Sequence, residues 1–282
     1  MLDKATQRKL DNLQGVLKEL NGVVVAFSGG VDSTFLTYIA QRTLGKRALA
    51  VTGCSVTLAK SEFKEAIKLA RRIGIRHRIV KTTEILIKSY KKNPTTRCYY
   101  CKNELYTRLR AIAADENIPH IIDGSNADDS CDFRPGMKAA RELGIRSPLI
   151  EAGFTKAEIR EMSKKLGLPT WDKPAMPCLS SRIPYGEKIT VEKIYQVEKA
   201  ESSLHSLGFK HLRIRHHGPI ARIEIPRGEF PRLFSESMTE KVVHFIKEAG
   251  FTYVSLDLEG FRSGSLNESN SPQKPLPMAL LP

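Results

Sequence analysis

Short apolar runs alternate with helix-like segments along the first half of this 282-residue chain, and this order restricts the possible folds more than any other feature. Residues 22–27 form a continuous apolar run of the kind found in buried parallel strands, and a helical pattern follows from 34 to about 44. Further strands are expected at 47–52, 77–81 and 119–122, with helical patterns at 60–73 and 102–116 between them. The alternation predicts an α/β fold: an open, mostly parallel sheet with helices on both faces.

The pattern changes near residue 180. The elements expected beyond it are a helix, two strands, a second helix and a third strand, at residues 190–207, 212–216, 221–225, 229–249 and 253–258. We therefore expect two domains, 1–180 and 181–262, the second being a smaller α/β unit. Residues 263–282 are rich in Ser, Asn, Pro and Gln, which predicts a disordered tail.

Composition narrows the function classes. No run of eighteen apolar residues occurs and the N-terminus is polar, so we expect a cytoplasmic protein with no membrane partner. The net charge of +14 is concentrated in residues 60–110, which contain 15 basic and 4 acidic side chains. This basic band indicates a polyanionic partner, either nucleotide phosphates or RNA, or else a solvated helix face.

The sharpest motif is Ser-Gly-Gly-Val-Asp-Ser at residues 28–33, between a predicted buried strand and a predicted helix. Glycines let the backbone turn tightly and approach an anion, which the free N–H groups at a helix start attract. Ser28 and Ser33 add hydroxyl donors, and Asp32 can hold Mg²⁺ or orient the loop. A phosphoryl-transferring Walker A loop needs Lys at the place of Asp32, so that class is disfavoured. An ordinary strand–helix turn is the alternative interpretation.

Two further groups of charged residues are candidate ligand contacts. Asp128 and Asp129 follow the predicted strand 119–122 and are candidates to contact Mg²⁺ or nucleotide, although acidic residues are also common in turns for structural reasons. Arg213 and Arg215 share one face of a predicted strand and can clamp a phosphate. Glu224 on the neighbouring strand is equally suited to be their ion-pair partner.

The five cysteines are an odd number, which disfavours a disulfide framework and favours metal or reactive-thiol roles. Cys98 and Cys101 form a Cys-x-x-Cys pair, and Cys178 lies in a segment stiffened by flanking prolines. Three thiolates suit a 4Fe–4S cluster with one iron open to an external ligand. For Cys178, a buried apolar role is the alternative, and Cys54 and Cys131 have no evident partners.

Residues 28–33 resemble the loop of the adenylating PP-loop ATP pyrophosphatases, and residues 123–129 resemble a turn seen in that superfamily. Further segments resemble the LarE family of ATP-dependent sulfur transferases, which helps to build the nickel-pincer nucleotide of lactate racemase. These segments are residues 132–136, 178–186, 213–224 and 256–264. The resemblance covers roughly residues 20 to 265.

The LarE resemblance implies adenylation of a carboxylate of a pyridinium dicarboxylate mononucleotide by ATP with Mg²⁺, followed by displacement of AMP by sulfur. It implies an ATP loop made of Ser28, Gly29, Gly30, Asp32 and Ser33. It also implies a substrate phosphate pocket made of Arg213, Arg215, Glu224 and Arg262, with Glu201 as a nearby acidic residue. A homo-oligomer and an external source of sulfide are the implied partners.

Two routes for the sulfur stay open in that family. In some members a cysteine at the position of Cys178 gives up its own sulfur, whereas others resemble this chain in having the Cys-x-x-Cys pair. We expect Cys98, Cys101 and Cys178 to ligate a 4Fe–4S cluster whose open iron carries the sulfide.

Other function classes are tRNA thiolase, nucleotide-sensing module and glutamine-fed amidating enzyme. The basic band of residues 60–110 favours the tRNA thiolase. The second domain has no recognisable RNA-binding signature, so we expect no nucleic-acid partner. The acidic turn and the three cysteines disfavour a sensing module, and no ammonia-generating domain supports amidation.

Overall fold

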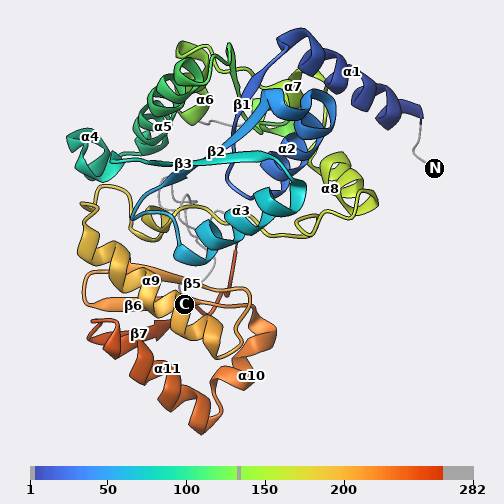
Figure 1. Cartoon of the computed structure of the whole chain (residues 1–282). Helices are drawn as coiled ribbons and strands as arrows, with labels where there is room; N and C mark the ends of the chain where they lie inside the picture. Colours follow the sequence, from blue (N-terminus) through green and yellow to red (C-terminus); the bar gives the residue numbers. More distant parts are fainter. Residues whose placement is uncertain (1–3, 132–134, 263–282) are drawn as a thin grey trace, which may run out of the picture. The chain divides into compact units, whose positions relative to one another are not determined.

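The computed structural model describes residues 4–131 and 135–262. The chain divides into two compact units, Met1–Cys178 and a second that begins at Leu179 (Figure 1). The expected tail, residues 263–282, lies outside the described residues, as do residues 132–134 of one LarE-like segment.

The first unit is built on a four-stranded, fully parallel sheet. Its strands are β1 (Val23–Ala26), β2 (Ala48–Cys54), β3 (Arg76–Lys81) and β4 (His120–Ile122). Their order across the sheet is β3-β2-β1-β4, and Val24 of β1 lies opposite both Leu49 and Ile121. The chain therefore runs outward from β1 to β3 and then crosses to the other side of β1. Ligands of such sheets bind where the order reverses, here at the carboxyl ends of β1 and β4.

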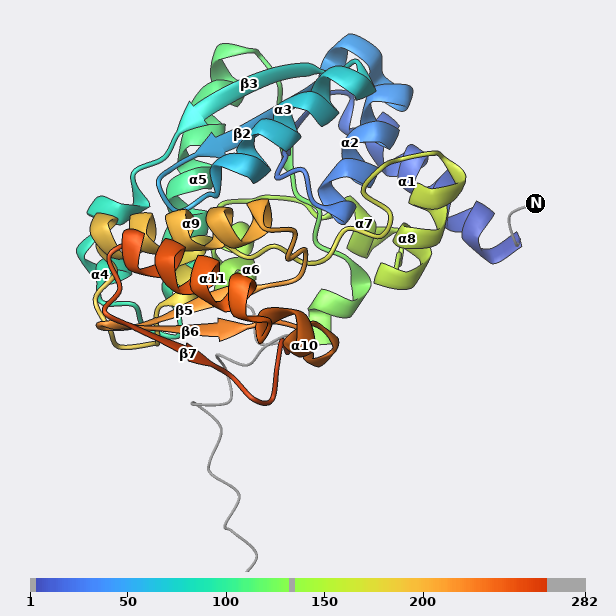
Figure 2. The same ribbon diagram turned by 90° about the horizontal axis from the view of Figure 1, so that it is seen from below.

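Helices cover both faces of this sheet. They are α1 (Lys4–Leu20), α2 (Val31–Leu44), α3 (Lys60–Ile73), α4 (Lys88–Lys91), α5 (Arg97–Asp115), α6 (Pro135–Glu142), α7 (Pro148–Glu151) and α8 (Lys156–Lys165). Val23 and Val25 belong to a core shared with α1, α2, α3 and α8, whereas Val24 packs with Tyr106 and Leu109 of α5. Figures 1 and 2 show α5 and α6 on the side of the sheet opposite α2 and α3.

The second unit has a smaller mixed sheet. Strand β5 (Arg213–His217) runs antiparallel to β6 (Ile220–Glu224), which pairs in parallel with β7 (Tyr253–Leu256). Its helices are α9 (Val191–Ser206), α10 (Phe230–Leu233) and α11 (Glu236–Glu248). Helix α9 contacts β5, and α11 contacts both α9 and β7. The predicted α/β class, with a parallel sheet and a smaller α/β unit, is confirmed.

Short 3₁₀ helices complete the chain: η1 (Gly45–Arg47), η2 (Glu84–Leu86), η3 (Ala127–Cys131), η4 (Leu179–Arg182) and η5 (Arg227–Glu229). Among the described residues, no helix is long and apolar enough to span a bilayer.

Some expected elements differ from the observed ones. The helix expected from residue 102 begins at Arg97, because its first turn buries Arg97 on Asn93 rather than an apolar side chain. The helix expected at 229–249 is two helices, with Ser235 as the N-cap of the second. Helix α8 was not predicted, although Thr155 and Glu158 form a complete capping box at its start.

Candidate functional site

The loop of residues 28–33 begins one residue after Phe27, which follows the end of β1 at Ala26, and runs into the first turn of α2. Gly29 has φ = 72°, a left-handed conformation that glycine adopts without steric cost. The hydroxyl oxygens of Ser28 and Ser33 lie 3.0 Å apart, and the Gly30 N–H donates to Ser28 Oγ at 3.3 Å. The two serines therefore close the turn, and the start of α2 lies at its end, where helices bind anions.

The turn after β4 lies directly against this loop. A Cβ added to Gly124 would lie 2.9 Å from the backbone nitrogen of Ser33, closer than such atoms approach. Only glycine fits there without displacing the start of α2. The parallel pairing of β1 with β4 thus brings together two predicted motifs, residues 28–33 and 123–129.

The acidic residues of these two turns are joined through one lysine of α8. The ammonium of Lys156 pairs with the Asp32 carboxylate, and the Lys156 backbone N–H donates to Asp128 Oδ2 at 2.8 Å. Asp32 Oδ1 is buried and accepts no hydrogen bond from the described part of the chain. Asp129 is buried, and its Oδ2 accepts from the Asn126 N–H at 3.0 Å, which holds the turn. Asp32 and Asp128 are therefore better placed than Asp129 to contact Mg²⁺.

Two lysines beside the loop were missed in the sequence. Besides Lys156, Lys173 approaches the loop, with Nζ 3.3 Å from the carbonyl oxygen of Gly29. The capping box at Thr155 and Glu158 was the available signal for Lys156, because it marks a helix start. No local pattern marks Lys173, which lies in an irregular segment.

The three predicted cysteines all belong to the first unit. Cys98 and Cys101 lie near the start of α5, with Cys98 exposed and Cys101 and Cys178 half-buried. Desolvation of the thiol and the charge of Cys178 raise the pKa of both Cys98 and Cys101. The ammonium of Lys102 opposes this effect on each. The three sulfurs are thus near enough to repel one another as thiolates.

Three cysteines are a donor set that iron–sulfur clusters use. Among residues 4–131 and 135–262, no three His, Cys, Asp or Glu side chains are arranged to hold one metal ion. Cysteines of a 4Fe–4S cubane bind different iron atoms, so their sulfurs lie further apart than the ligands of one ion. The mutual repulsion of Cys98, Cys101 and Cys178 is what bound iron would relieve. Nothing is described of the Cys131 side chain.

In the second unit, most of the predicted phosphate-binding residues are engaged with one another. Arg215 and Glu224, both fully buried, form a two-point ion pair with Nε–Oε1 and Nη2–Oε2 distances of 2.9 Å. Glu201 is held in the same way by buried Arg182, with oxygens 2.9 and 3.1 Å from its nitrogens. Arg215, Glu224 and Glu201 therefore hold the fold together.

Arg213 differs from these residues. It is buried, forms no ion pair with any residue that the structure describes, and stacks on Phe261 with 4.8 Å from guanidinium to ring centre. Burial, together with the neighbouring Arg182 and Arg215, lowers the pKa of Arg213 to about 10. An anion would relieve this repulsion, so Arg213 is the strongest candidate for a phosphate contact. Arg262 follows Phe261 in the sequence and pairs with Glu259 at 2.7 Å.

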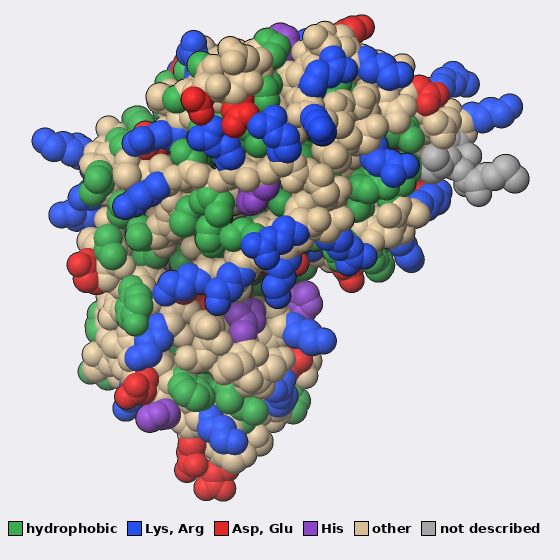
Figure 3. Space-filling model, viewed as in Figure 1, with side chains coloured by type: hydrophobic (Ala, Val, Ile, Leu, Met, Phe, Trp, Pro, Cys, Tyr) green, Lys and Arg blue, Asp and Glu red, His purple; other side chains and the backbone are tan. Residues whose placement is uncertain are grey.

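The basic band of residues 60–110 is partly neutralised by local ion pairs. Arg78 pairs with Asp115 at 2.7 Å and with Glu116 at 2.9 Å, and Arg108 pairs with Glu104 at 3.0 Å. Figure 3 shows Lys and Arg side chains scattered over the face of the first unit that carries α3 and β3. The sequence count thus overstates the charge available to a polyanion.

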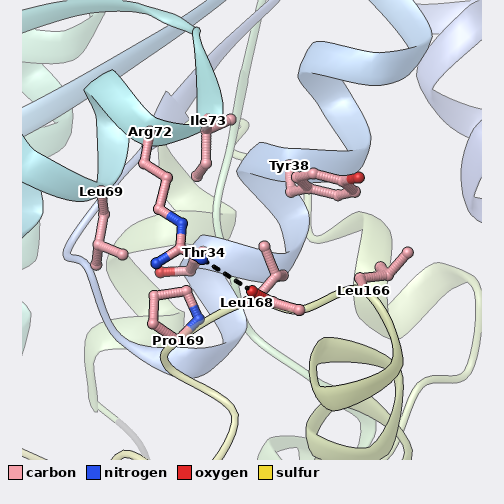
Figure 4. A pocket seen from close by; sticks show the side chains of 9 residues that line it. Thr34, Tyr38, Leu69, Arg72, Ile73, Leu166, Leu168 and Pro169 are labelled. Atoms are coloured by element: carbon pink, nitrogen blue, oxygen red, sulfur yellow. Dashed lines mark hydrogen bonds between the residues drawn. The ribbon is translucent and has the colours of Figure 1, made fainter.

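A small cavity of about 150 Å³ lies between α2, α3 and the chain after α8 (Figure 4). Arg72 donates to the Gly167 carbonyl across it at 3.4 Å, and Thr34, Leu69 and Pro169 contribute to its walls. None of the predicted site residues lines it. It is separate from the candidate site.

Comparison with known proteins shows which protein families the chain resembles. A model of the NAD synthase family matches residues 6–116. The chain is 45% identical over 261 residues to an uncharacterized protein of Synechocystis sp., covering 93% of this chain and 97% of the relative. It is 39% identical over 262 residues to the pyridinium-3,5-bisthiocarboxylic acid mononucleotide synthase of Lactiplantibacillus plantarum, covering 93% and 94%. The glutamine-hydrolyzing GMP synthase of Aeropyrum pernix is 27% identical over 210 residues, covering 67% of this chain and 41% of that relative.

The parallel sheet, the loop at its switch point and the match to NAD synthase define a member of the PP-loop class of ATP-using enzymes. Within that class the chain belongs to the LarE family, the family of the Lactiplantibacillus plantarum synthase. The resemblance found in the sequence is thereby confirmed.

Proposed function

We propose that the protein is an ATP-dependent sulfur transferase that converts a carboxylate of a pyridinium dicarboxylate mononucleotide into a thiocarboxylate. The similarity to the Lactiplantibacillus plantarum synthase carries this proposal, because it extends over 93% of this chain and 94% of that protein. A similarity confined to the ATP loop would support only the PP-loop class.

The first half-reaction is assigned to the loop. Its N–H groups and the start of α2 would bind the pyrophosphate part of ATP, and Asp32 and Asp128 would hold Mg²⁺, which would neutralise charge on the phosphates. A substrate carboxylate oxygen attacks the α-phosphorus, the bond to pyrophosphate breaks, and an acyl-adenylate forms. A sulfur nucleophile then attacks the acyl carbon, so that a C–S bond replaces the C–O bond and AMP leaves.

The sulfur is assigned to the three-cysteine site. Cys98, Cys101 and Cys178 are proposed to hold a 4Fe–4S cluster, which when bound supplies an iron without a protein ligand, where sulfide can be carried. The Cys-x-x-Cys spacing of Cys98 and Cys101, with Cys178 near enough to act electrostatically on both thiols, supports this. In the alternative route, Cys178 gives up its own sulfur in a single turnover.

The substrate phosphate is assigned to the second unit. Arg213 is its principal contact, and Arg215, Glu224, Glu201 and Arg262 shape the pocket around it. The support is electrostatic: Arg213 is buried beside two other arginines, and charge-assisted bonds to phosphate would satisfy it. A homo-oligomer, a cytoplasmic location and an external sulfide donor remain predictions from the family resemblance.

The test is anaerobic turnover of the mononucleotide with Mg·ATP and sulfide, followed by mass spectrometry of the product and by assay of iron and acid-labile sulfide. We expect thiocarboxylate, AMP and pyrophosphate, with about four irons per chain if one cubane is bound. Loss of multiple turnovers in Cys98→Ala supports the cluster. Unchanged turnover in that variant would refute the cluster, and conversion of Cys178 to dehydroalanine would establish the sacrificial route.

A second candidate is a tRNA thiolase with the same loop and cluster, which the basic band of residues 60–110 favours. A salt-dependent gel shift with total tRNA separates the two functions, because phosphate contacts weaken steeply with salt. We expect no shift at physiological salt, and a shift accompanied by ATP-dependent tRNA thiolation would replace the first proposal.

A further inference from the structure

We propose that Lys173 binds the phosphates of ATP, and that Arg160 fixes the backbone from which both Lys173 and the Cys178 segment extend. ATP binding and the position of the reactive sulfur are then joined through one short stretch of chain. This inference rests on the proposed function for the role of Cys178, whereas its ATP-binding part does not.

The ammonium of Lys173 lies at the loop and is almost enclosed. Its side chain is 11% exposed, and Nζ lies 2.8 Å from Glu62 Oε2 and 2.9 Å from Glu65 Oε2. Its third contact is the carbonyl oxygen of Gly29, at 3.3 Å. The contacts with Glu65 and Gly29 are hydrogen bonds, and the contact with Glu62 is an ion pair. Lys173 is therefore a cation held by two carboxylates and in contact with the backbone of the anion-binding loop.

The charges around Lys173 explain why a cation is needed there. Glu62 and Glu65 lie three residues apart on α3 and so project from one face of the helix. Without Lys173, two carboxylates would stand beside a loop that receives a triphosphate, and their repulsion would weaken its binding. A lysine is suited to change partners from carboxylate to phosphate, because its ammonium is a point charge on a flexible stem.

The backbone of this lysine is held separately from its side chain. Arg160 of α8 donates from Nη1 to the Trp171 carbonyl at 2.7 Å and from Nη2 to the Lys173 carbonyl at 2.8 Å. The Lys173 N–H donates to the Thr170 carbonyl at 3.0 Å. Four residues separate this anchored point from Cys178, and two of them are prolines, whose φ angles are fixed. The path from the loop to the sulfur is thus short and stiff.

Two substitutions separate the two roles. Lys173→Met removes the cation, whereas Arg160→Met removes only the backbone anchor; Lys165→Met, on the exposed side of α8, is the matched control. Two readouts are measured on the full-length, reduced and iron-free chain: the affinity for Mg·ATP by calorimetry, and the alkylation rate of Cys178 by peptide mass spectrometry with and without Mg·ATP.

We expect Lys173→Met to weaken Mg·ATP binding about tenfold or more, because a charge-assisted contact is lost, and Lys173→Arg to restore most of it. Arg160→Met is expected to keep its ATP affinity within about threefold while Cys178 is alkylated faster and no longer responds to ATP. Circular dichroism checks that each variant is folded.

Wild-type ATP affinity in Lys173→Met would overturn the phosphate contact. Unchanged Cys178 alkylation in Arg160→Met would overturn the link to the sulfur. A failure of the proposed function is distinguishable: the chain would then form no thiocarboxylate, while ATP binding would still depend on Lys173.

Discussion

The two anion sites assigned to this molecule use charge in opposite ways. In the first unit, glycines and backbone N–H groups surround the expected pyrophosphate, and Asp32 and Asp128 stand at its edge. In the second unit, arginine and glutamate side chains are buried in two-point pairs, whereas the buried Arg213 forms no ion pair with a described residue. A glycine-rich motif whose backbone binds the anion identifies the anion site from sequence. A motif of charged side chains does so less clearly, because some of those side chains form ion pairs that stabilise the fold.

The largest expected effect is a loss of folding stability when Glu224 is replaced, because Glu224 belongs to a buried ion pair. Removing its carboxylate leaves the buried guanidinium of Arg215 without its counter-charge, and broken buried pairs cost about 3–5 kcal/mol. We expect Glu224→Ala to lower the free energy of unfolding of the second unit by this amount in urea titrations. The double variant Arg215→Met/Glu224→Met should recover most of the loss. A single variant as stable as wild type would show that the pair does not support the fold.

Arg213 should show the reverse behaviour. Arg213→Met removes a cation that folding already disfavours, so the urea midpoint should stay close to that of wild type. Its affinity for the mononucleotide should fall by about 1.5–3 kcal/mol, the value of a hydrogen bond to a charged group. Calorimetry with nicotinic acid mononucleotide, which carries the same kind of phosphate, measures this loss. Because the pKa of Arg213 is about 10, wild-type binding should also weaken as the pH rises through 10. A strongly destabilised variant would instead assign Arg213 to the fold.

In the first unit, a methyl group added at Gly124 tests whether backbone packing shapes the nucleotide site. Gly124→Ala places a Cβ 2.9 Å from the Ser33 nitrogen and must displace the start of α2. We expect Mg·ATP affinity to fall by about 1 kcal/mol, at the lower end of overpacking effects. Gly15→Ala is the control, because no atom lies within 4 Å of the added carbon and α1 favours alanine. Equal ATP affinity in both variants would separate the turn after β4 from the nucleotide site.

The smallest expected effect concerns the thiols. Desolvation, followed by the charges of Cys178 and Glu84, raises the pKa of Cys101, so the folded chain keeps a proton that the unfolded chain loses above pH about 8.5. Stability should therefore fall as the pH rises, by about 0.8 kcal/mol for this thiol at pH 9. Urea titrations of reduced, metal-free protein at pH 7 and pH 9 measure it. Cys101→Ala should flatten the dependence, and an unchanged slope would contradict the raised pKa.

The fold was largely predictable because β1, β2 and β4 are short, largely apolar and mostly buried strands, whereas β3 is largely exposed. Residues 22–27 contain β1 whole, and the loop after it lies where the parallel topology requires. The start of α5 was not predictable from periodicity, since it buries Arg97. The break between α10 and α11 depends on the capping position of Ser235 rather than on apolar spacing.

The candidate site was predictable only in part. Glycine motifs and cysteine spacing are local signals, and they identified residues 28–33 and the Cys98–Cys101 pair. The contacts of Lys156 with Asp32 and of Lys173 with Gly29 span 124 and 144 residues of sequence, and they depend on tertiary packing. Choosing between Arg213 and Arg215 required the pairing of Arg215 with Glu224 across the sheet.

The close approach of Gly124 to Ser33 has a further consequence for how a ligand is received. Two turns whose backbones touch have no side chain between them that could change rotamer, so little conformational freedom is left in the floor of the site. Binding of a nucleotide there does not require ordering of the protein, so the entropy lost on binding is mainly that of the ligand. Exchange of the hydrogen-bonded Phe27 and Thr34 amides, which flank the anion-binding loop, should then be slow in the free protein and change little when ATP binds.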